Sequence, residues 1–315
     1  MVTLKLRHNL RLAYAGLLDA SLVGLFLSDN AQVLENTFQL RNESAPPRLG
    51  QGLLQSLEDG DFDCVAVPLE DFAYYVSSRK TTKLKILGCL LGGDTRVIGE
   101  VGLERAVTDT RCLGASSPGC ALMRFDDLSC ALDFEFRCVA SWVPQDRMIE
   151  AIQMQKFDFL EVNSYWEAVL GLRLGLFRQT FKLQDYGIPA SRSHLLVINI
   201  ENRSVSHEAY QKLRSQLLGA YELVLSETDK TFDIMNSRLK TLTPRLDTLN
   251  AHVLSASVRT LMPHFAEAHR TSLSLDWHDL QLFYRWFWAK LAHTSEPWER
   301  VPPVSLEHLI CDFWS

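Results

Sequence analysis

Two stretches decide the fold of this chain: LRLAYAG at residues 10–16 and DFDCVAVP at residues 61–68. Each is a short apolar run that stops at a loop and is followed by residues with helical periodicity. A parallel strand has this pattern, because it is buried on both faces and its C-terminal end opens on the crevice where ligands bind. The two stretches therefore predict a cleft for a small molecule, built from the ends of strands.

The size and composition of the chain predict a folded protein with two lobes. Its 315 residues exceed what one hydrophobic core usually organises, so we expect two lobes of about 100 to 200 residues each. Hydrophobic residues make up 47% of the chain and charged residues 22%, as in ordinary globular proteins. The formal net charge of -6 gives no basic field, which argues against nucleic acid as a partner.

No segment is predicted to insert directly into a membrane. No apolar run approaches the ~20 residues of a membrane span, and the N-terminal MVTLKLRH lacks the apolar core of a secretion signal. We therefore expect a cytoplasmic protein, or a periplasmic one if a signal peptide has been removed. The seven cysteines form no C-x-x-C pair, which favours buried, reduced thiols over disulfides or a zinc site.

Strand and helix signals alternate along the first two thirds of the chain, which predicts an α/β fold with mostly parallel sheets flanked by helices. A G-G-D turn at 92–94 separates two extended segments, and a second cycle of strands begins at Thr110. From Ser204 onward the periodicity is helical, so we expect a helical C-terminal third. The expected strands are 10–16, 32–40, 63–67, 83–91, 96–101, 110–114, 136–143, 157–162 and 194–200, and the expected late helices are 206–226, 230–242, 246–266 and 277–292.

This order of elements resembles the type II periplasmic solute-binding protein fold. Within that fold it is similar to the branch that binds nitrate, sulfonates, taurine and thiamine precursors, which includes pyrimidine synthase-like proteins. Three segments carry the resemblance: the first strand with its loop, residues 10–24; LLQSLEDGDFD at 53–63, similar to a family element of leucine, small residues, glycine and aspartate; and residues 148–158, its counterpart in the second lobe.

The resemblance implies a discontinuous first lobe, residues 1–105 plus 194–315, with a second lobe of residues 106–193 inserted into it. Two crossings between lobes make a hinge that closes on a ligand. The implied function is that of a solute-binding receptor of an ABC transporter, whose ligand is a small anionic or heteroaromatic molecule. A membrane permease is the implied partner if the protein is secreted.

Candidate ligand-binding residues of the first lobe lie at the predicted strand ends. They are Tyr14, Gly16, Asp19, Pro68, Leu69, Gly93 and Asp94. For several of them a structural role is an open alternative: Tyr14 as a packing residue, Asp19 as a helix cap, and Gly93 as a turn residue.

The second lobe offers an anion site at Ser116, Ser117 and Gly119, because hydroxyl and N–H groups at a helix start suit a carboxylate, sulfonate or phosphate. Ordinary helix-start chemistry is the alternative, with Ser117 as the N-cap. A further set, Asn163, Tyr165 and Trp166, follows another strand and offers amide, hydroxyl and aromatic groups. Burial of Trp166 in the lobe is the alternative for that residue.

An enzyme on the same fold is the alternative function. Thiamine-pyrimidine synthases carry a CCCFC element together with a lysine and a histidine in the first loop, and aromatic sulfinate desulfinases carry a cysteine there; this chain has YAGLLDA at 14–20 instead. A cytosolic lyase or dehydratase remains an open alternative. No H-x-x-x-H or H-E-x-x-H pattern occurs, so no metal and no cofactor are expected.

Overall fold

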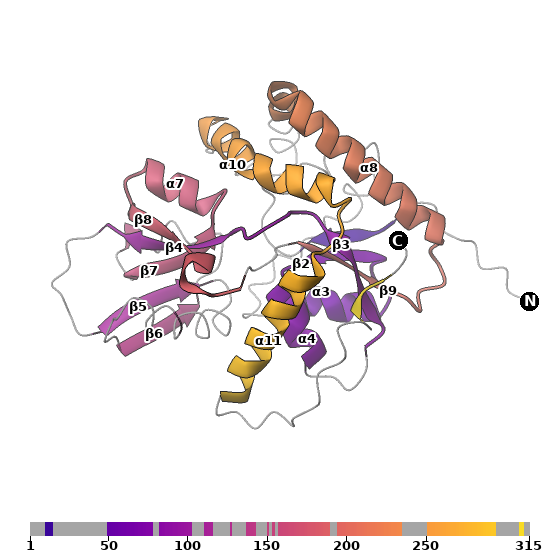
Figure 1. Cartoon of the computed structure of the whole chain (residues 1–315), viewed down its shortest axis with the longest axis horizontal. Coiled ribbons are helices and arrows are strands. Elements are labelled where there is room, and N and C mark those ends of the chain that lie inside the picture. The colour runs from indigo at the N-terminus through magenta and orange to yellow at the C-terminus, as the bar shows by residue number, and fades with distance from the viewer. Residues whose placement is uncertain are drawn as a thin grey trace, which may run out of the picture.

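The computed structural model describes residues 10–14, 49–77, 82–102, 110–115, 127, 137–142, 150, 153–154, 157–189, 194–234, 251–293 and 309–311. These residues form two β-sheets with helices packed against them (Figure 1). The predicted α/β class is therefore confirmed. Among the described helices, none combines the length and the apolar composition that crossing a membrane requires.

The first sheet has the strand order β1-β2-β9-β3. Strands β1 and β2 are parallel, whereas β9 is antiparallel to both β2 and β3. Three strands of this sheet therefore point in one direction, and β9 lies between two of them pointing the other way. Their bounds are Leu12–Tyr14 for β1, Cys64–Val67 for β2, Leu84–Cys89 for β3 and Leu195–Asn199 for β9.

The second sheet repeats this arrangement in the order β6-β5-β7-β4-β8. Strand β5 is parallel to β6 and β7, and β4 is antiparallel to both β7 and β8. Four strands thus share a direction, and β4 opposes them. The bounds are Arg96–Val101 for β4, Thr110–Ala115 for β5, Arg137–Trp142 for β6, Phe159–Asn163 for β7 and Phe177–Lys182 for β8.

The two reversed strands are those that follow a crossing between the sheets. The chain passes to the second sheet between β3 and β4, and it returns to the first between β8 and β9. Strand β4 begins where β7 ends, because Arg96 pairs with Asn163, and β9 begins where β2 and β3 end, because Leu195 pairs with Val67 and Cys89. A strand that starts where its neighbours end must run against them.

This topology refines the sequence predictions in two ways. Most strands of each sheet do share one direction, as the prediction of mostly parallel sheets requires, but one reversed strand per sheet was not predicted. The predicted lobe limit at residue 105 also lies after β4, a strand that pairs only in the second sheet. The chain therefore passes from the first sheet to the second between β3 and β4.

Helices cover both faces of the first sheet (Figure 1). Helices α8 and α10 pack on the face that carries Leu12 and Cys64, and helices α3, α4 and α11 pack on the face that carries Val65 and Val67. The buried rings of Phe283 and Phe287 on α11 contribute to the core on this second face. The bounds are Leu49–Glu58 for α3, Leu69–Ser77 for α4, His207–Ser226 for α8, Ala251–Arg270 for α10 and Trp277–His293 for α11.

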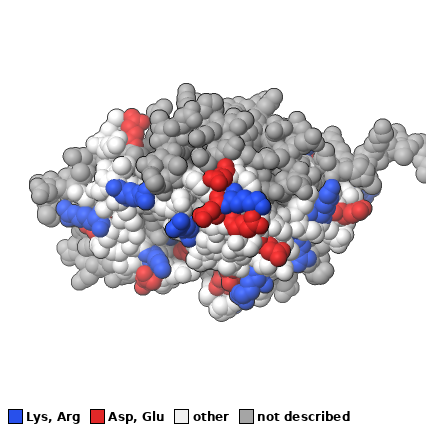
Figure 2. Space-filling model, turned by 90° about the horizontal axis from the view of Figure 1, so that it is seen from above, with Lys and Arg blue, Asp and Glu red and all other residues white. Residues whose placement is uncertain are grey.

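The last third of the described chain is helical, as predicted, and a short helix α7, Glu167–Arg173, packs on the second sheet. Positive and negative side chains are interspersed over the surface seen in Figure 2. Cys64, Cys89, Cys112 and Cys311 are free thiols, and the first two and the last are buried. Burial raises the pKa of the Cys64 thiol, so this sulfur stays protonated.

Candidate functional site

The carboxyl ends of β2, β3 and β7 meet where the chain first crosses between the sheets. We call this region the junction: residues 90–95, residues 163–167 and His194. The backbone N–H of Leu90 donates to the carbonyl of His194 at 3.0 Å, and that of Ser164 donates to the carbonyl of Thr95 at 2.9 Å. The crossing segment is thus bonded to the first sheet at one end and to the second sheet at the other.

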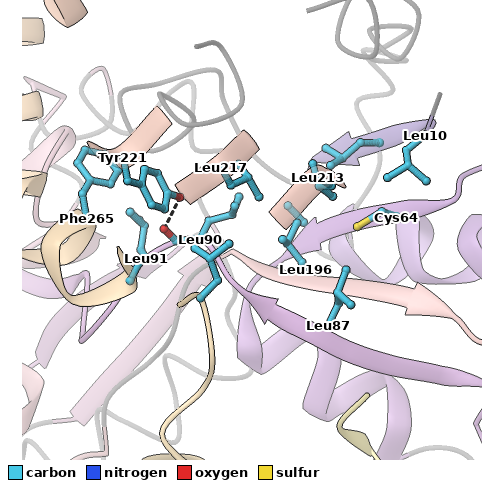
Figure 3. Close-up of a cluster of buried hydrophobic side chains, with 14 of the residues drawn as sticks. Leu10, Cys64, Leu87, Leu90, Leu91, Leu196, Leu213, Leu217, Tyr221 and Phe265 are labelled. Carbon is cyan, nitrogen blue, oxygen red and sulfur yellow. Dashed lines mark hydrogen bonds between the residues drawn. The ribbon is translucent and has the colours of Figure 1, made fainter. Parts of the chain in front are cut away.

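Helices α8 and α10 fix the crossing segment from one side. The Tyr221 hydroxyl of α8 donates to the Leu90 carbonyl at 2.6 Å (Figure 3). The Gly92 N–H donates to the His264 carbonyl at 3.0 Å, and His264 Nδ1 lies 2.5 Å from the Gly92 carbonyl, which can only accept. A Cβ atom on Gly92 would lie 2.4 Å from Cγ of Glu267, so this position has no room for a side chain.

Apolar packing continues across the junction. Tyr165 and Trp166, which follow β7 of the second sheet, lie in the same buried cluster as Leu90 and Tyr221, part of which Figure 3 shows. A second contact between the halves involves α11. The indole Nε1 of Trp286 donates to Oδ2 of Asp127 at 2.6 Å, and Lys290 forms an ion pair with the same carboxylate.

A set of polar side chains lies at the junction, and we call it the Arg96 cluster. Its members come from β4, β7, α4 and the residues beside them: Asp71, Arg96, Glu161, Asn163, Tyr165, Glu167 and His194. Arg96 and Asn163 are cross-strand neighbours, and Glu161 lies two residues before Asn163. These three side chains therefore share one face of the second sheet.

Carboxylates surround the guanidinium of Arg96. Burial acts to lower its pKa, but Glu161, Tyr165, Glu167 and Asp71 together outweigh burial, so the pKa is raised and the group stays charged. Asp71 is half-buried at the start of α4, and burial raises the pKa of its carboxyl to about 6, although Arg96 acts to lower it. Among the described residues, three carboxyl groups thus act electrostatically on one guanidinium.

Asn163 is held by Glu167 and is buried, with 3% of its surface exposed. Its backbone N–H donates to Oε2 of Glu167 at 3.0 Å, and its Nδ2 lies 3.5 Å from Oε1 of the same carboxylate. Its Oδ1 and the neighbouring Ser164 Oγ are buried atoms without a hydrogen-bond partner in the described part of the chain. Such acceptors are costly to bury unless something donates to them.

His194 occupies a backbone conformation that is unusual for its residue type. Its φ of 70° lies in the left-handed region, and the side chain is only 4% exposed. The Tyr165 hydroxyl lies 3.5 Å from Nε2. Burial, together with the charge of Arg96, lowers the pKa of His194 to about 3, so the ring is neutral at physiological pH. Strain of this kind is typical of sites with a function.

Eight of the predicted ligand residues lie in the described part of the chain. Asn163 and Tyr165 belong to the Arg96 cluster, and Gly93 and Asp94 are in the crossing segment, where Gly93 has a φ of 73° that fits a turn. Leu69 and Trp166 are buried in hydrophobic cores. For Trp166 this is the alternative role, burial, that the sequence left open. Pro68 is half-buried after β2, and Tyr14 ends β1. Gly16, Asp19, Ser116, Ser117 and Gly119 lie outside the described residues.

Sequence analysis missed most of the Arg96 cluster: Asp71, Arg96, Glu161, Glu167 and His194. One signal was present, because Glu161 interrupts the apolar strand FLEVN, where a charged side chain is costly without partners. Arg96 and His194 flank apolar strands in the same way. Asp71 reaches the cluster from α4, which packs on the first sheet, and only the fold shows that it lies near Arg96.

Comparison of the sequence found no matching protein-family model and no curated protein of similar sequence. The fold, in contrast, occurs in many solved structures. The aliphatic sulphonate binding protein SsuA of Escherichia coli is similar with a TM-score of 0.61 and 14% identity, over 96% of this chain and 97% of that chain. The Candida albicans CA3427 gene product is similar with a TM-score of 0.61 and 11% identity, over 91% of both chains.

A third example is the ligand-binding component of an ABC-type import system from Staphylococcus aureus, a structure with zinc bound. Its TM-score is 0.56 at 14% identity, over 88% of this chain and 98% of that chain. The Candida protein is described as having the generic periplasmic binding protein structural fold. The chain described here has that same fold, and the expectation from its strand order and strand-end loops is confirmed.

Proposed function

We propose that this protein binds a small molecule at the junction and closes two lobes upon it. One lobe forms around each sheet, with the boundary between β3 and β4. The Arg96 cluster is the observation that carries the proposal, because it gathers polar groups from both sides of the crossing. Asp71 comes from the side of the first sheet, whereas Arg96, Glu161 and Asn163 come from the second.

Closure follows because both lobes contribute side chains to the cluster. A ligand that contacts groups of both lobes binds more tightly when the lobes are together, and this difference in affinity shifts the population toward the closed state. The crossing segment is the hinge, because it is the short connection through which the lobes move. Solute capture by the sulphonate-binding and import proteins of the same fold supports the proposal.

The partner follows from where the protein works. For an exported form, the partner class is a membrane permease that receives the ligand, as for components of ABC-type import systems. For a form that stays in the cytoplasm, the bound molecule itself is the signal. In both settings the ligand and the closure are the same.

Native mass spectrometry of the freshly purified protein tests the proposal, followed by denaturation and identification of any released molecule. We expect a one-to-one adduct, and small-angle scattering should show a smaller radius of gyration with ligand than without. Asn163→Ala should weaken the adduct, whereas Gln184→Ala, at an exposed position of the second lobe, should leave it unchanged. A protein that stays empty, and that no component of a metabolite mixture shifts in mass or unfolding temperature, contradicts the proposal. Conversion of a component into a new mass would instead identify an enzyme.

A further inference from the structure

We infer that the ligand presents a cationic hydrogen-bond donor, a protonated amine or amidine, to the Arg96 cluster. This inference rests on the proposed function, and it differs from the anionic or heteroaromatic ligand that the sequence predicted. Three features of the junction support it: the balance of charge, the unpartnered Asn163 oxygen and the acidic first turn of α4.

The charge of the cluster is the first feature. Asp71, Glu161 and Glu167 all act electrostatically on one guanidinium, that of Arg96. His194 adds no charge, because its ring is buried and neutral. Among the described residues the cluster therefore holds more carboxyl groups than cations, so its net charge attracts a cation and repels an anion. A cationic ligand would be favoured at this site, whereas an anion would add to the negative charge.

Asn163 is the second feature. Its amide nitrogen is directed toward the Glu167 carboxylate, 3.5 Å from Oε1, which fixes the orientation of the amide. The Oδ1 atom is buried and has no donor among the described residues. A carbonyl oxygen accepts hydrogen bonds and cannot donate them. The group that completes it must therefore be a donor, and the N–H of an amine or amidine is a strong one.

The first turn of α4 is the third feature. A helix N-terminus attracts anions, because its N–H groups and dipole are positive. In α4 this turn carries two acidic residues, Glu70 and Asp71. An anionic ligand would therefore meet groups of like charge at the start of this helix.

Matched probes test the inference. One series is phenethylamine, 2-phenylethanol and 3-phenylpropionate, and the other is butylamine, 1-butanol and butanesulfonate. Within each series the skeleton is kept and only the charged group changes. Dissociation constants for the ligand-free protein should be at least about tenfold lower for the amine than for the neutral and anionic members.

Substitutions then assign the effect to the cluster. Glu161→Gln should weaken binding of the amine by about tenfold to a hundredfold, because it removes the buried negative charge that would pair with the amine. Glu100→Gln is the matched control, since the half-buried Glu100 accepts a hydrogen bond from Gln179 on the same sheet and lies outside the cluster. It should leave the amine affinity unchanged. If Glu161→Gln does not fold, Asp71→Asn makes the same test at a half-buried position.

The outcomes separate this inference from the function on which it rests. Tighter binding of the anionic members, or release of an anionic molecule from the purified protein, would overturn the cationic ligand and leave the binding function intact. Amine binding that Glu161→Gln and Asp71→Asn both leave unchanged would also overturn it, because the cation then binds elsewhere. Failure of every probe and of every cellular metabolite to bind would refute the binding function itself.

Discussion

Replacing His194 by asparagine should make the protein relatively more stable in acid. The ring is buried and neutral, and its pKa is lowered to about 3 from the ordinary 6.5. Between these two values the unfolded chain binds a proton at His194 that the folded protein does not bind, so stability falls as the pH drops through this window. Asparagine removes the titration, and it tolerates the left-handed backbone that position 194 requires.

The size of the effect follows from the pKa difference. Each pKa unit corresponds to about 1.4 kcal/mol, so at pH 5, one and a half units below the ordinary value, protonation of the unfolded chain costs the native protein about 2 kcal/mol. Asp71 acts in the opposite direction. Because its folded pKa is raised to about 6, the folded protein retains this proton, and stability rises as the pH drops from 6 toward 4. The wild-type profile therefore conceals two opposed slopes.

Urea unfolding at pH 7.5 and pH 5.0 measures the prediction. Relative to wild type, His194→Asn should gain about 2 kcal/mol on going to the lower pH, whatever its cost at pH 7.5. Replacement of the exposed His278 by asparagine is the control, since it removes a histidine that is not buried. If His194→Asn keeps a constant difference from wild type at both values, the histidine is freely protonated and the account of a neutral, buried ring is refuted.

Three further substitutions test how the fold is held. Tyr221→Phe leaves the Leu90 carbonyl at the crossing without its donor and should lower the unfolding free energy by about 1–3 kcal/mol in chemical denaturation. Gly92→Ala should lower the unfolding free energy by about 1–3 kcal/mol, because the new methyl group overlaps helix α10. An unchanged melting temperature would mean that the crossing segment can shift without loss of stability. Arg11→Met should cost about 3 kcal/mol, since it leaves the fully buried Asp63 carboxylate without its cation, and a loss below 1 kcal/mol would show that other donors suffice.

The sequence predicted the elements well where their periodicity was unambiguous. The apolar run VAV at 65–67 is fully buried on both faces of its strand, and such a run has few other uses in a short segment. The helices at 207–226 and 277–293 begin within a residue of their predicted starts, because Ser206 caps the first and Asp276 accepts from the start of the second. Local chemistry fixes these boundaries, so a single sequence contains them.

The direction of each strand was harder to predict from the sequence. Nothing in RVIGEV at 96–101 distinguishes a strand that opposes its neighbours from one that follows them, because the pattern of buried residues is the same in both. The direction is set by the place where the chain enters the sheet. That place depends on the short crossing after β3, which brings Arg96 beside the end of β7.

The candidate site was predicted only in part, because a single sequence does not show which distant residues the fold brings together. Asn163 and Tyr165 were found because they stand at a strand end, which sequence can identify. Asp71 was not singled out, and His194 was placed only at the beginning of a strand, because their common neighbour Arg96 is distant in sequence from both. Polar groups that meet only through tertiary structure leave no spacing to recognise.

The reversal of β4 and β9 and the position of the Arg96 cluster have one origin. Because each crossing starts and ends at a carboxyl edge, the ends of three strands and the beginnings of two lie together at the junction. Polar groups from the sides of both sheets are neighbours in this region, and any molecule that bonds to Asp71 and Asn163 together must also fix the two sheets relative to one another. In the proposed function, binding and closure would therefore be coupled by the topology itself, whatever the ligand.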